Sequence, residues 1–159
     1  MTAWPDPPGG ILDGASHLYP LRVFFDDTDA GGVVYHANYL NWFERARSDL
    51  VAMLGIDQRS ALEAGEGVYA VAEIHIRYFA PARLGDAVVI ETEAGHVGRV
   101  SCTLRQKARR GGTVLSQATV KVGFIGPDGK PRRQPQAWQD AFASLLASPA
   151  QQTLSEGQE

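Results

Sequence analysis

The segment DDTDAGGVVYHANY, residues 26–39, gathers side chains whose types and spacing suit covalent chemistry. It holds three carboxylates, the last of them Asp29, then two adjacent glycines, and it ends where an apolar helical pattern begins. Gly31 and Gly32 let the backbone turn sharply where a side chain would obstruct it. The amide hydrogens at a helix start lack partners within the helix and carry a partial positive charge. The segment therefore combines a carboxylate with a site suited to a developing oxyanion.

A carboxylate opposite an oxyanion site fits attack on a carbonyl group by water or by the carboxylate itself. The sequence offers no evident general acid for a poor leaving group. A thiolate needs little help to leave, because a thiol has a pKa of about 8.5. Thioester hydrolysis is thus the reaction that best matches these groups. The alternative is a plain capping turn, the commoner role of an Asp-rich segment before a helix.

Hydrophobic periodicity predicts the elements that must position this segment. Apolar residues at helical spacing predict a helix over residues 37–54, ended by Gly55. Gly111 and Gly112 suit a two-residue hairpin turn. Alternation of apolar and polar residues predicts strands at residues 21–25, 69–79, 87–94, 99–109 and 113–125, and a second helix is expected at residues 136–147.

One long helix and about five antiparallel strands indicate an α+β domain whose sheet wraps around the helix, because no other element can cover it. Such a sheet leaves an edge strand exposed, so self-association is expected. Composition places this single domain at residues 19–147. A Pro- and Gly-rich segment, residues 1–18, and a polar tail, residues 148–159, are expected to be flexible.

Composition excludes several classes of protein. A length of 159 residues with 44% hydrophobic residues fits one domain, and a net charge of −3 argues against nucleic-acid binding. The single cysteine, Cys102, excludes an intrachain disulfide and a multi-thiolate metal site. His17, His75 and His96 lack the spacing of metal ligands, so no metal site is expected. No stretch has the length and hydropathy of a membrane span or a leader peptide, and we expect a cytoplasmic protein.

The stretch VFFDDTDAGGVVYHANY, residues 23–39, followed by FERAR at residues 43–47, resembles the signature of hot dog fold acyl-CoA thioesterases of the 4-hydroxybenzoyl-CoA thioesterase type. Within that group it is most similar to the Tol-Pal-associated (YbgC) branch. YFAPARLGD at residues 78–86 and GKPRR at residues 129–133 extend the similarity. The resemblance implies a hot dog fold, an acyl-CoA substrate, hydrolysis without metal or organic cofactor, and a homodimer or tetramer with the pocket across the dimer interface.

The resemblance also assigns roles to particular residues. The family's catalytic carboxylate corresponds to Asp29, as nucleophile or general base, and the backbone N–H that polarises the thioester carbonyl corresponds to His36, whose imidazole can also position substrate or water. Tyr35 and Gly32 would line the substrate site. Basic side chains that would meet the phosphates of coenzyme A are Arg83, Arg99, Lys130, Arg132 and Arg133.

Alternatives stay open for both residue and function. Another hot dog branch uses a helix carboxylate, which makes Glu44 a rival to Asp29, although an ion pair with Arg47 at i,i+3 is the simpler interpretation. The rival functions are an acyl-carrier-protein thioesterase, a dehydratase on the same fold, and a non-catalytic acyl-CoA-binding or envelope-associated scaffold.

Overall fold

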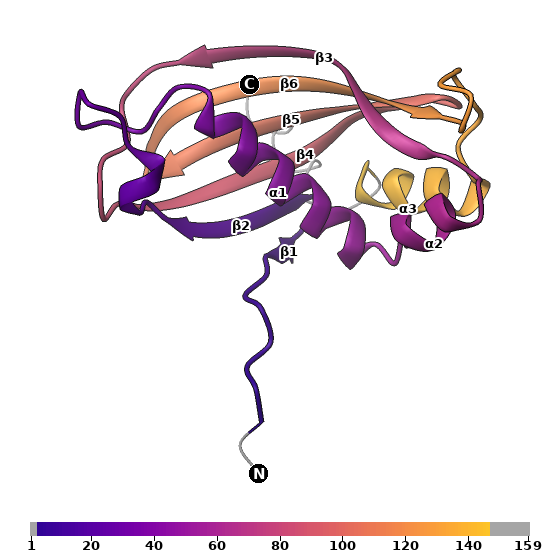
Figure 1. Ribbon diagram of the computed structural model, residues 1–159, viewed down its shortest axis with the longest axis horizontal. Helices are drawn as coiled ribbons and strands as arrows, with labels where there is room; N and C mark the ends of the chain where they lie inside the picture. The colour runs from indigo at the N-terminus through magenta and orange to yellow at the C-terminus, as the bar shows by residue number, and fades with distance from the viewer. Residues whose placement is uncertain (1–2, 147–159) are drawn as a thin grey trace, which may run out of the picture.

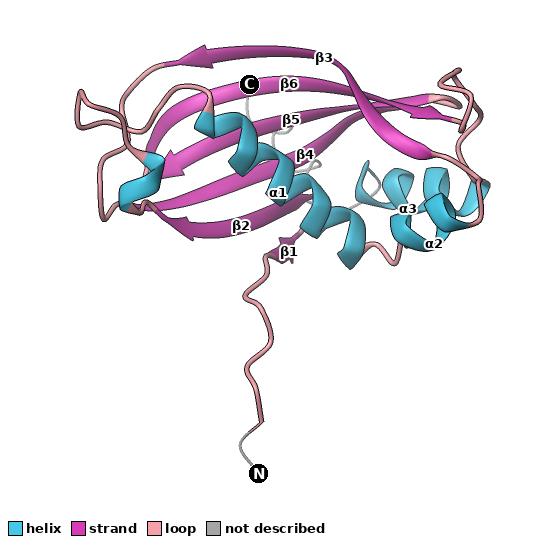
Figure 2. Ribbon diagram, in the orientation of Figure 1, coloured by secondary structure: helices cyan, strands magenta, loops and turns pink. Residues whose placement is uncertain are grey.

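Six antiparallel strands form one sheet, in the order β1-β2-β4-β5-β6-β3, which curves around the long helix α1 (Figure 1). The computed structural model describes residues 3–146. Two shorter helices lie together at one end of the sheet, and the loops before α1 lie at the other (Figure 2). The strands are β1 (Ile11–Asp13), β2 (Ser16–Arg22), β3 (Val68–Tyr78), β4 (Ala87–Val97), β5 (Ser101–Arg110) and β6 (Thr113–Ile125), and the helices are α1 (Asn38–Met53), α2 (Gln58–Glu63) and α3 (Gln136–Leu146).

The core lies between α1 and the concave face of the sheet. Strands β5 and β6 alternate buried residues with half-buried or exposed ones, because successive side chains of a strand point to opposite faces. Apolar side chains of α1 complete this core: Tyr39, Trp42, Phe43, Ala46, Leu50 and Val51. The helix and the four strands after it lie within three residues of their expected positions at each end, which confirms an α+β fold with the sheet around one helix.

The N-terminal part of the fold differs from the expectation. The expected strand at residues 21–25 is wrong, because β2 ends at Arg22 and Phe25–Asp27 form a 3₁₀ turn. The expected flexible segment is wrong from Ile11 onward, since β1 and β2 belong to the sheet, which therefore has six strands. Pairing with β4, from Ser16 opposite Glu93 to Arg22 opposite Ala87, imposes the extended conformation on a stretch with little alternation. The expected polar tail, residues 148–159, lies outside the described residues.

A hydrogen bond from a buried histidine fastens this N-terminal part to α1. His17 on β2 is fully buried, and its Nε2 donates to Oδ2 of Asp49 on α1 at 2.6 Å. The same oxygen accepts the backbone N–H of Gly10 at 2.9 Å. Asp49 therefore holds the chain before β1 against the helix.

Gly10 occupies a position with no room for a side chain. A Cβ there would lie 2.6 Å from the carbonyl oxygen of Leu18 and 2.6 Å from Nε2 of His17. We expect Gly10→Ala to destabilise the fold by about 1–3 kcal/mol through overpacking, measured by denaturant unfolding. The control is Gly123→Ala on β6, where a Cβ would meet nothing within 4 Å. Equal unfolding midpoints for the two variants would contradict this account of the N-terminal attachment.

Candidate active site

Asp27 joins the turn before α1 to the start of the helix. Its Oδ2 accepts the backbone N–H of Phe24 at 2.7 Å, and its Oδ1 accepts a hydrogen bond from Nδ2 of Asn38 at 2.7 Å. Its carbonyl oxygen accepts the N–H of Tyr35 at 3.0 Å. Both carboxylate oxygens are thus engaged in holding the loop, as expected for a structural residue.

Asp29 lies on the exposed part of this loop, with one carboxylate oxygen engaged and one free. Its Oδ1 accepts the N–H of Gly31 at 2.8 Å, and its carbonyl oxygen accepts the N–H of Gly32 at 3.0 Å. Gly32 has a φ of +75°, in the left-handed region that glycine adopts without strain. Within residues 3–146, Oδ2 of Asp29 has no hydrogen-bond partner. This oxygen is available to a water molecule or to a substrate.

His36 lies two residues before the start of α1, and its backbone N–H is free. No described residue accepts a hydrogen bond from this N–H, whereas the next helical amide, on Asn38, donates to the carbonyl of Tyr35 at 2.9 Å. A free N–H at the positive end of a helix is suited to an oxyanion. The imidazole of His36 is exposed and packs edge-on against the ring of Tyr35, with centroids 4.6 Å apart.

A pocket of about 310 Å³ opens beside His36. Aromatic rings form much of its wall, and the Tyr39 and Tyr78 rings meet edge to face at 5.5 Å. Burial raises the pKa of both Tyr39 and Tyr78, so both phenols stay protonated at neutral pH. The residues that line the pocket are Val34, His36, Tyr39, Tyr78, Phe79, Ala80 and Pro81.

Of the residues expected at the site, one loop carries Asp29, Gly32, Tyr35 and His36, and His36 is the one of these four that lines the pocket. Tyr78 is a pocket residue to which sequence reasoning gave no role. It belongs to the YFAPARLGD motif, and its hydroxyl donates to the carbonyl oxygen of His36 at 2.7 Å. The motif was the only available signal, because 42 residues separate the two partners.

The expected phosphate-binding arginines lie at opposite ends of β3. Arg83 is exposed on the loop after β3. This loop contacts the segment before α1, because the carbonyl of Ala82 accepts the N–H of Val34 at 2.9 Å. Arg132 lies near the start of β3, where its Nη1 donates to the carbonyl of Glu66 at 2.7 Å, and Nη2 of Arg133 donates to Gln136 at 3.2 Å. The 11 residues of β3 span roughly 35 Å. One protomer therefore does not bring Arg132 and Arg133 to Asp29.

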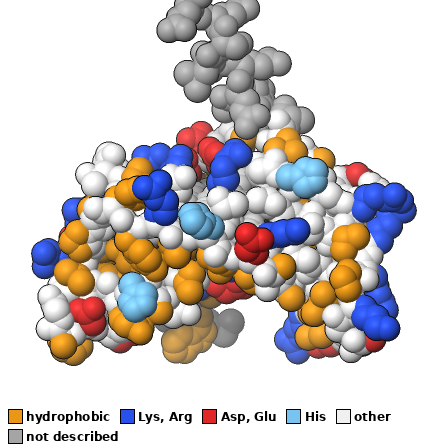
Figure 3. Space-filling model, turned by 90° about the horizontal axis from the view of Figure 1, so that it is seen from above, with side chains coloured by type: hydrophobic (Ala, Val, Ile, Leu, Met, Phe, Trp, Pro, Cys, Tyr) orange, Lys and Arg blue, Asp and Glu red, His pale blue; other side chains and the backbone are white. Residues whose placement is uncertain are grey.

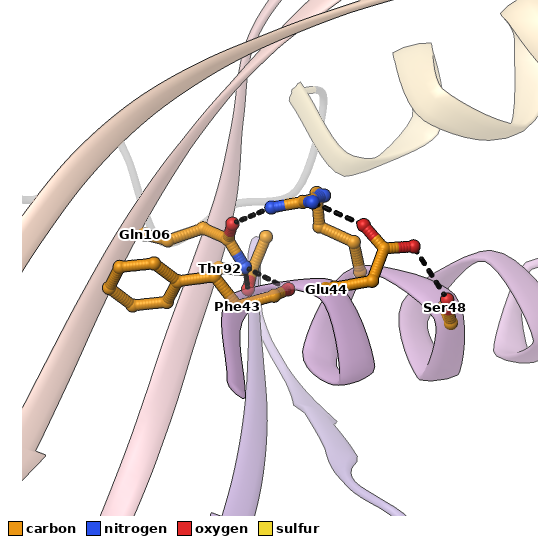
Figure 4. Close-up of polar contacts among 6 residues, drawn as sticks. Phe43, Glu44, Ser48, Thr92 and Gln106 are labelled. Carbon is orange, nitrogen blue, oxygen red and sulfur yellow. Dashed lines mark hydrogen bonds and ion pairs between the residues drawn. The ribbon is translucent and has the colours of Figure 1, made fainter. Parts of the chain in front are cut away.

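Glu44, the rival carboxylate, forms the expected ion pair with Arg47 (Figure 4). Arg47 is only 6% exposed, and its Nη1 donates to Oε1 of Gln106 at 2.8 Å. The amide of Gln106 in turn donates to the carbonyl of Phe43 and to the hydroxyl of Thr92, each at 3.0 Å. A buried guanidinium is costly without such partners, so the Glu44 carboxylate has a structural task that Asp29 lacks.

Residues 3–146 contain no group of three or more His, Cys, Asp or Glu side chains placed to hold a metal ion. The same residues form no helix long and apolar enough to cross a membrane.

Comparison with known proteins agrees with this fold. The chain is 41% identical to the acyl-CoA thioesterase YbgC of Haemophilus influenzae over 67% of its own length and 79% of the relative's. It is 38% identical to the acyl-CoA thioester hydrolase YbgC of Escherichia coli O6:H1, over 75% and 90% of the two chains. The crystal structure of a probable thioesterase from Bartonella henselae superposes with a TM-score of 0.72 at 32% identity, covering 76% of this chain and 99% of that one.

The fold is that of the hot dog thioesterases, an antiparallel sheet around a central helix. The family model of the thioesterase superfamily matches residues 31–117. The chain belongs to this superfamily and is a thioester hydrolase. The matched residues include Gly32, His36 and Tyr78, and Asp29 lies two positions before the match begins.

Proposed function

We propose that the protein hydrolyses the thioester of an acyl-CoA to the free acid and coenzyme A, with Asp29 as nucleophile or general base and the backbone N–H of His36 stabilising the oxyanion. One observation carries the proposal: a free carboxylate oxygen and a free helix-start N–H lie on the same short loop, and the residue that carries the N–H, His36, lines a pocket. The relatives named as acyl-CoA thioesterases support coenzyme A as the thiol portion of the substrate.

Two routes through Asp29 give the same products. As a general base, Asp29 takes a proton from water while the water oxygen bonds to the thioester carbon; the C–S bond then breaks and the thiolate leaves. As a nucleophile, the carboxylate bonds to that carbon and expels the thiolate, and water then hydrolyses the mixed anhydride. In both routes the carbonyl oxygen becomes negative before the C–S bond breaks, and the His36 N–H stabilises it.

A panel of acyl-CoA substrates tests this function. Free-thiol release should appear with short-chain, long-chain or aromatic acyl groups, and the same acyl groups on an acyl carrier protein should react more slowly. Faster turnover of the carrier-protein substrates would favour an acyl-carrier-protein thioesterase. Binding without thiol release across the whole panel would favour a non-catalytic acyl-CoA-binding or envelope-associated scaffold.

The open edge of the sheet favours a second copy of the chain as partner, in a homodimer or a tetramer built from dimers. The sheet ends in β1, only three residues long, and in β3, which has eleven. A long unpaired edge is a template for strand pairing. Figure 3 looks onto the β3 side, where hydrophobic side chains gather with histidines among them. Antiparallel pairing of two β3 strands would place Arg132 and Arg133 of one copy near Asp29 of the other.

We expect light scattering to give at least a dimer for the purified protein. Val71→Asp on β3, where the valine is 47% exposed, should weaken the dimer about tenfold or more, because it places a charge from each copy in the paired edge. Leu12→Asp on β1, at a leucine that is 41% exposed, is the matched control and should stay dimeric. An active wild-type monomer would overturn the dimer proposal.

A further inference from the structure

The Tyr78 hydroxyl reaches the one peptide at the helix start that the helix itself leaves unpaired. Tyr78 is the last residue of β3, and its hydroxyl donates to the carbonyl oxygen of His36 at 2.7 Å. The first amides of α1 do not use this carbonyl, because Asn38 donates to Tyr35 and Leu40 donates to Ala37. The ring of Tyr78 also packs edge-on against the rings of His36 at 6.3 Å and Tyr39 at 5.5 Å.

Two hydrogen bonds fix the peptide planes around the free N–H of His36. The bond from Asn38 N–H to the Tyr35 carbonyl orients the peptide that carries the His36 N–H. The Tyr78 bond orients the next peptide, which carries the N–H of Ala37, and a trans peptide points its N–H away from its carbonyl. With both planes fixed, the helix-start N–H groups are aimed before a substrate binds, and preorganisation of this kind stabilises an oxyanion.

We propose that Tyr78 is a positioning residue for the oxyanion site, whose hydroxyl holds the His36–Ala37 peptide so that the helix-start N–H groups stay directed at the thioester carbonyl oxygen. The inference rests on the proposed function, because it needs an oxyanion at that place. Tyr78 acts through the backbone and forms no bond to the substrate. A carbonyl oxygen can only accept, so the phenol must be the donor, and partial burial moves its pKa further above the neutral range.

The test is Tyr78→Phe, which removes the hydroxyl and keeps the ring contacts. The Tyr78 hydrogen bond matters only when the carbonyl oxygen of the thioester becomes charged. Its loss should therefore lower kcat and leave substrate binding unchanged. We expect kcat to fall about tenfold with KM unchanged, less than the loss from deleting a direct oxyanion donor, which is about 10²–10³-fold. The ¹⁵N–¹H signals of His36 and Ala37 should shift in the same variant, a readout that does not depend on turnover.

Tyr69→Phe is the matched control, because Tyr69 lies at the other end of β3 and its hydroxyl donates to Oε1 of Gln134 at 2.6 Å. It should lower the melting temperature and leave kcat unchanged. If the wild type is active and Tyr78→Phe is equally active, the role of Tyr78 is overturned and the proposed function stands. The same holds if Tyr78→Phe changes only KM, or if Tyr69→Phe lowers kcat by the same factor. A wild type that releases no thiol from any acyl-CoA overturns the proposed function and this role together.

Discussion

Replacement of Asp29 by asparagine is expected to lower kcat about 10³-fold, within the 10²–10⁴-fold typical of a lost general base, and to leave KM within a few-fold of wild type. Asparagine keeps the oxygen that accepts the Gly31 N–H, so the loop retains its shape. It replaces the free Oδ2 by an amide nitrogen, which can neither take a proton from water nor attack a carbonyl. Steady-state thiol release and substrate binding measured on the same preparation separate these effects.

Two variants make the Asp29 result specific. Asp26→Asn changes an exposed carboxylate on the same loop that makes no hydrogen bond to any described residue, and it should cost little activity. Glu44→Gln should lower stability more than kcat, because the Glu44 carboxylate pairs with the buried Arg47. An active Asp29→Asn enzyme together with an inactive Glu44→Gln enzyme would move the catalytic carboxylate to α1.

Local sequence pattern predicted the central helix and four strands because their apolar residues recur at the period of the element itself. The expected helix at residues 37–54 is observed as α1, Asn38–Met53, and β6 was predicted without error. Strand β2 was placed too late in the chain because its extended form depends on pairing with β4, about seventy residues away.

The candidate site likewise contains residues that local sequence predicts and residues that only distant contacts place. Asp29, Gly32, Tyr35 and His36 are local to one loop, so sequence placed them together, and their roles stay predictions. The hydroxyl of Tyr78 reaches this loop only through the path of β3, which no local pattern describes. Arg132 looked equivalent to Arg83 in the sequence, yet its guanidinium is bound to the carbonyl of Glu66 at the far end of β3.

The rate of hydrolysis is expected to depend strongly on the leaving group of the substrate. The loop offers an attacking carboxylate and an oxyanion site, but no proton donor paired with the leaving group. A thiol has a pKa of about 8.5, whereas that of an alkyl alcohol is close to that of water, about 15.7. The two leaving groups differ in pKa by roughly 7 units. If a third of this difference appears as a difference in activation free energy, an alkyl oxygen ester should react about 10²-fold more slowly than the matched thioester.

The measurement compares kcat/KM for an acyl-CoA and its oxygen-ester analogue with the same acyl group and the same coenzyme portion, so that binding is nearly constant. An ester activated by an aryl leaving group should recover much of the rate, because an aryl alcohol such as a tyrosine phenol has a pKa of only about 10. Equal kcat/KM values for the thioester and the alkyl ester would require a proton donor at the leaving group. The exposed imidazole of His36 is the group in this loop that could supply that proton, and His36→Ala, which keeps the backbone N–H, would then abolish ester hydrolysis while sparing the thioester.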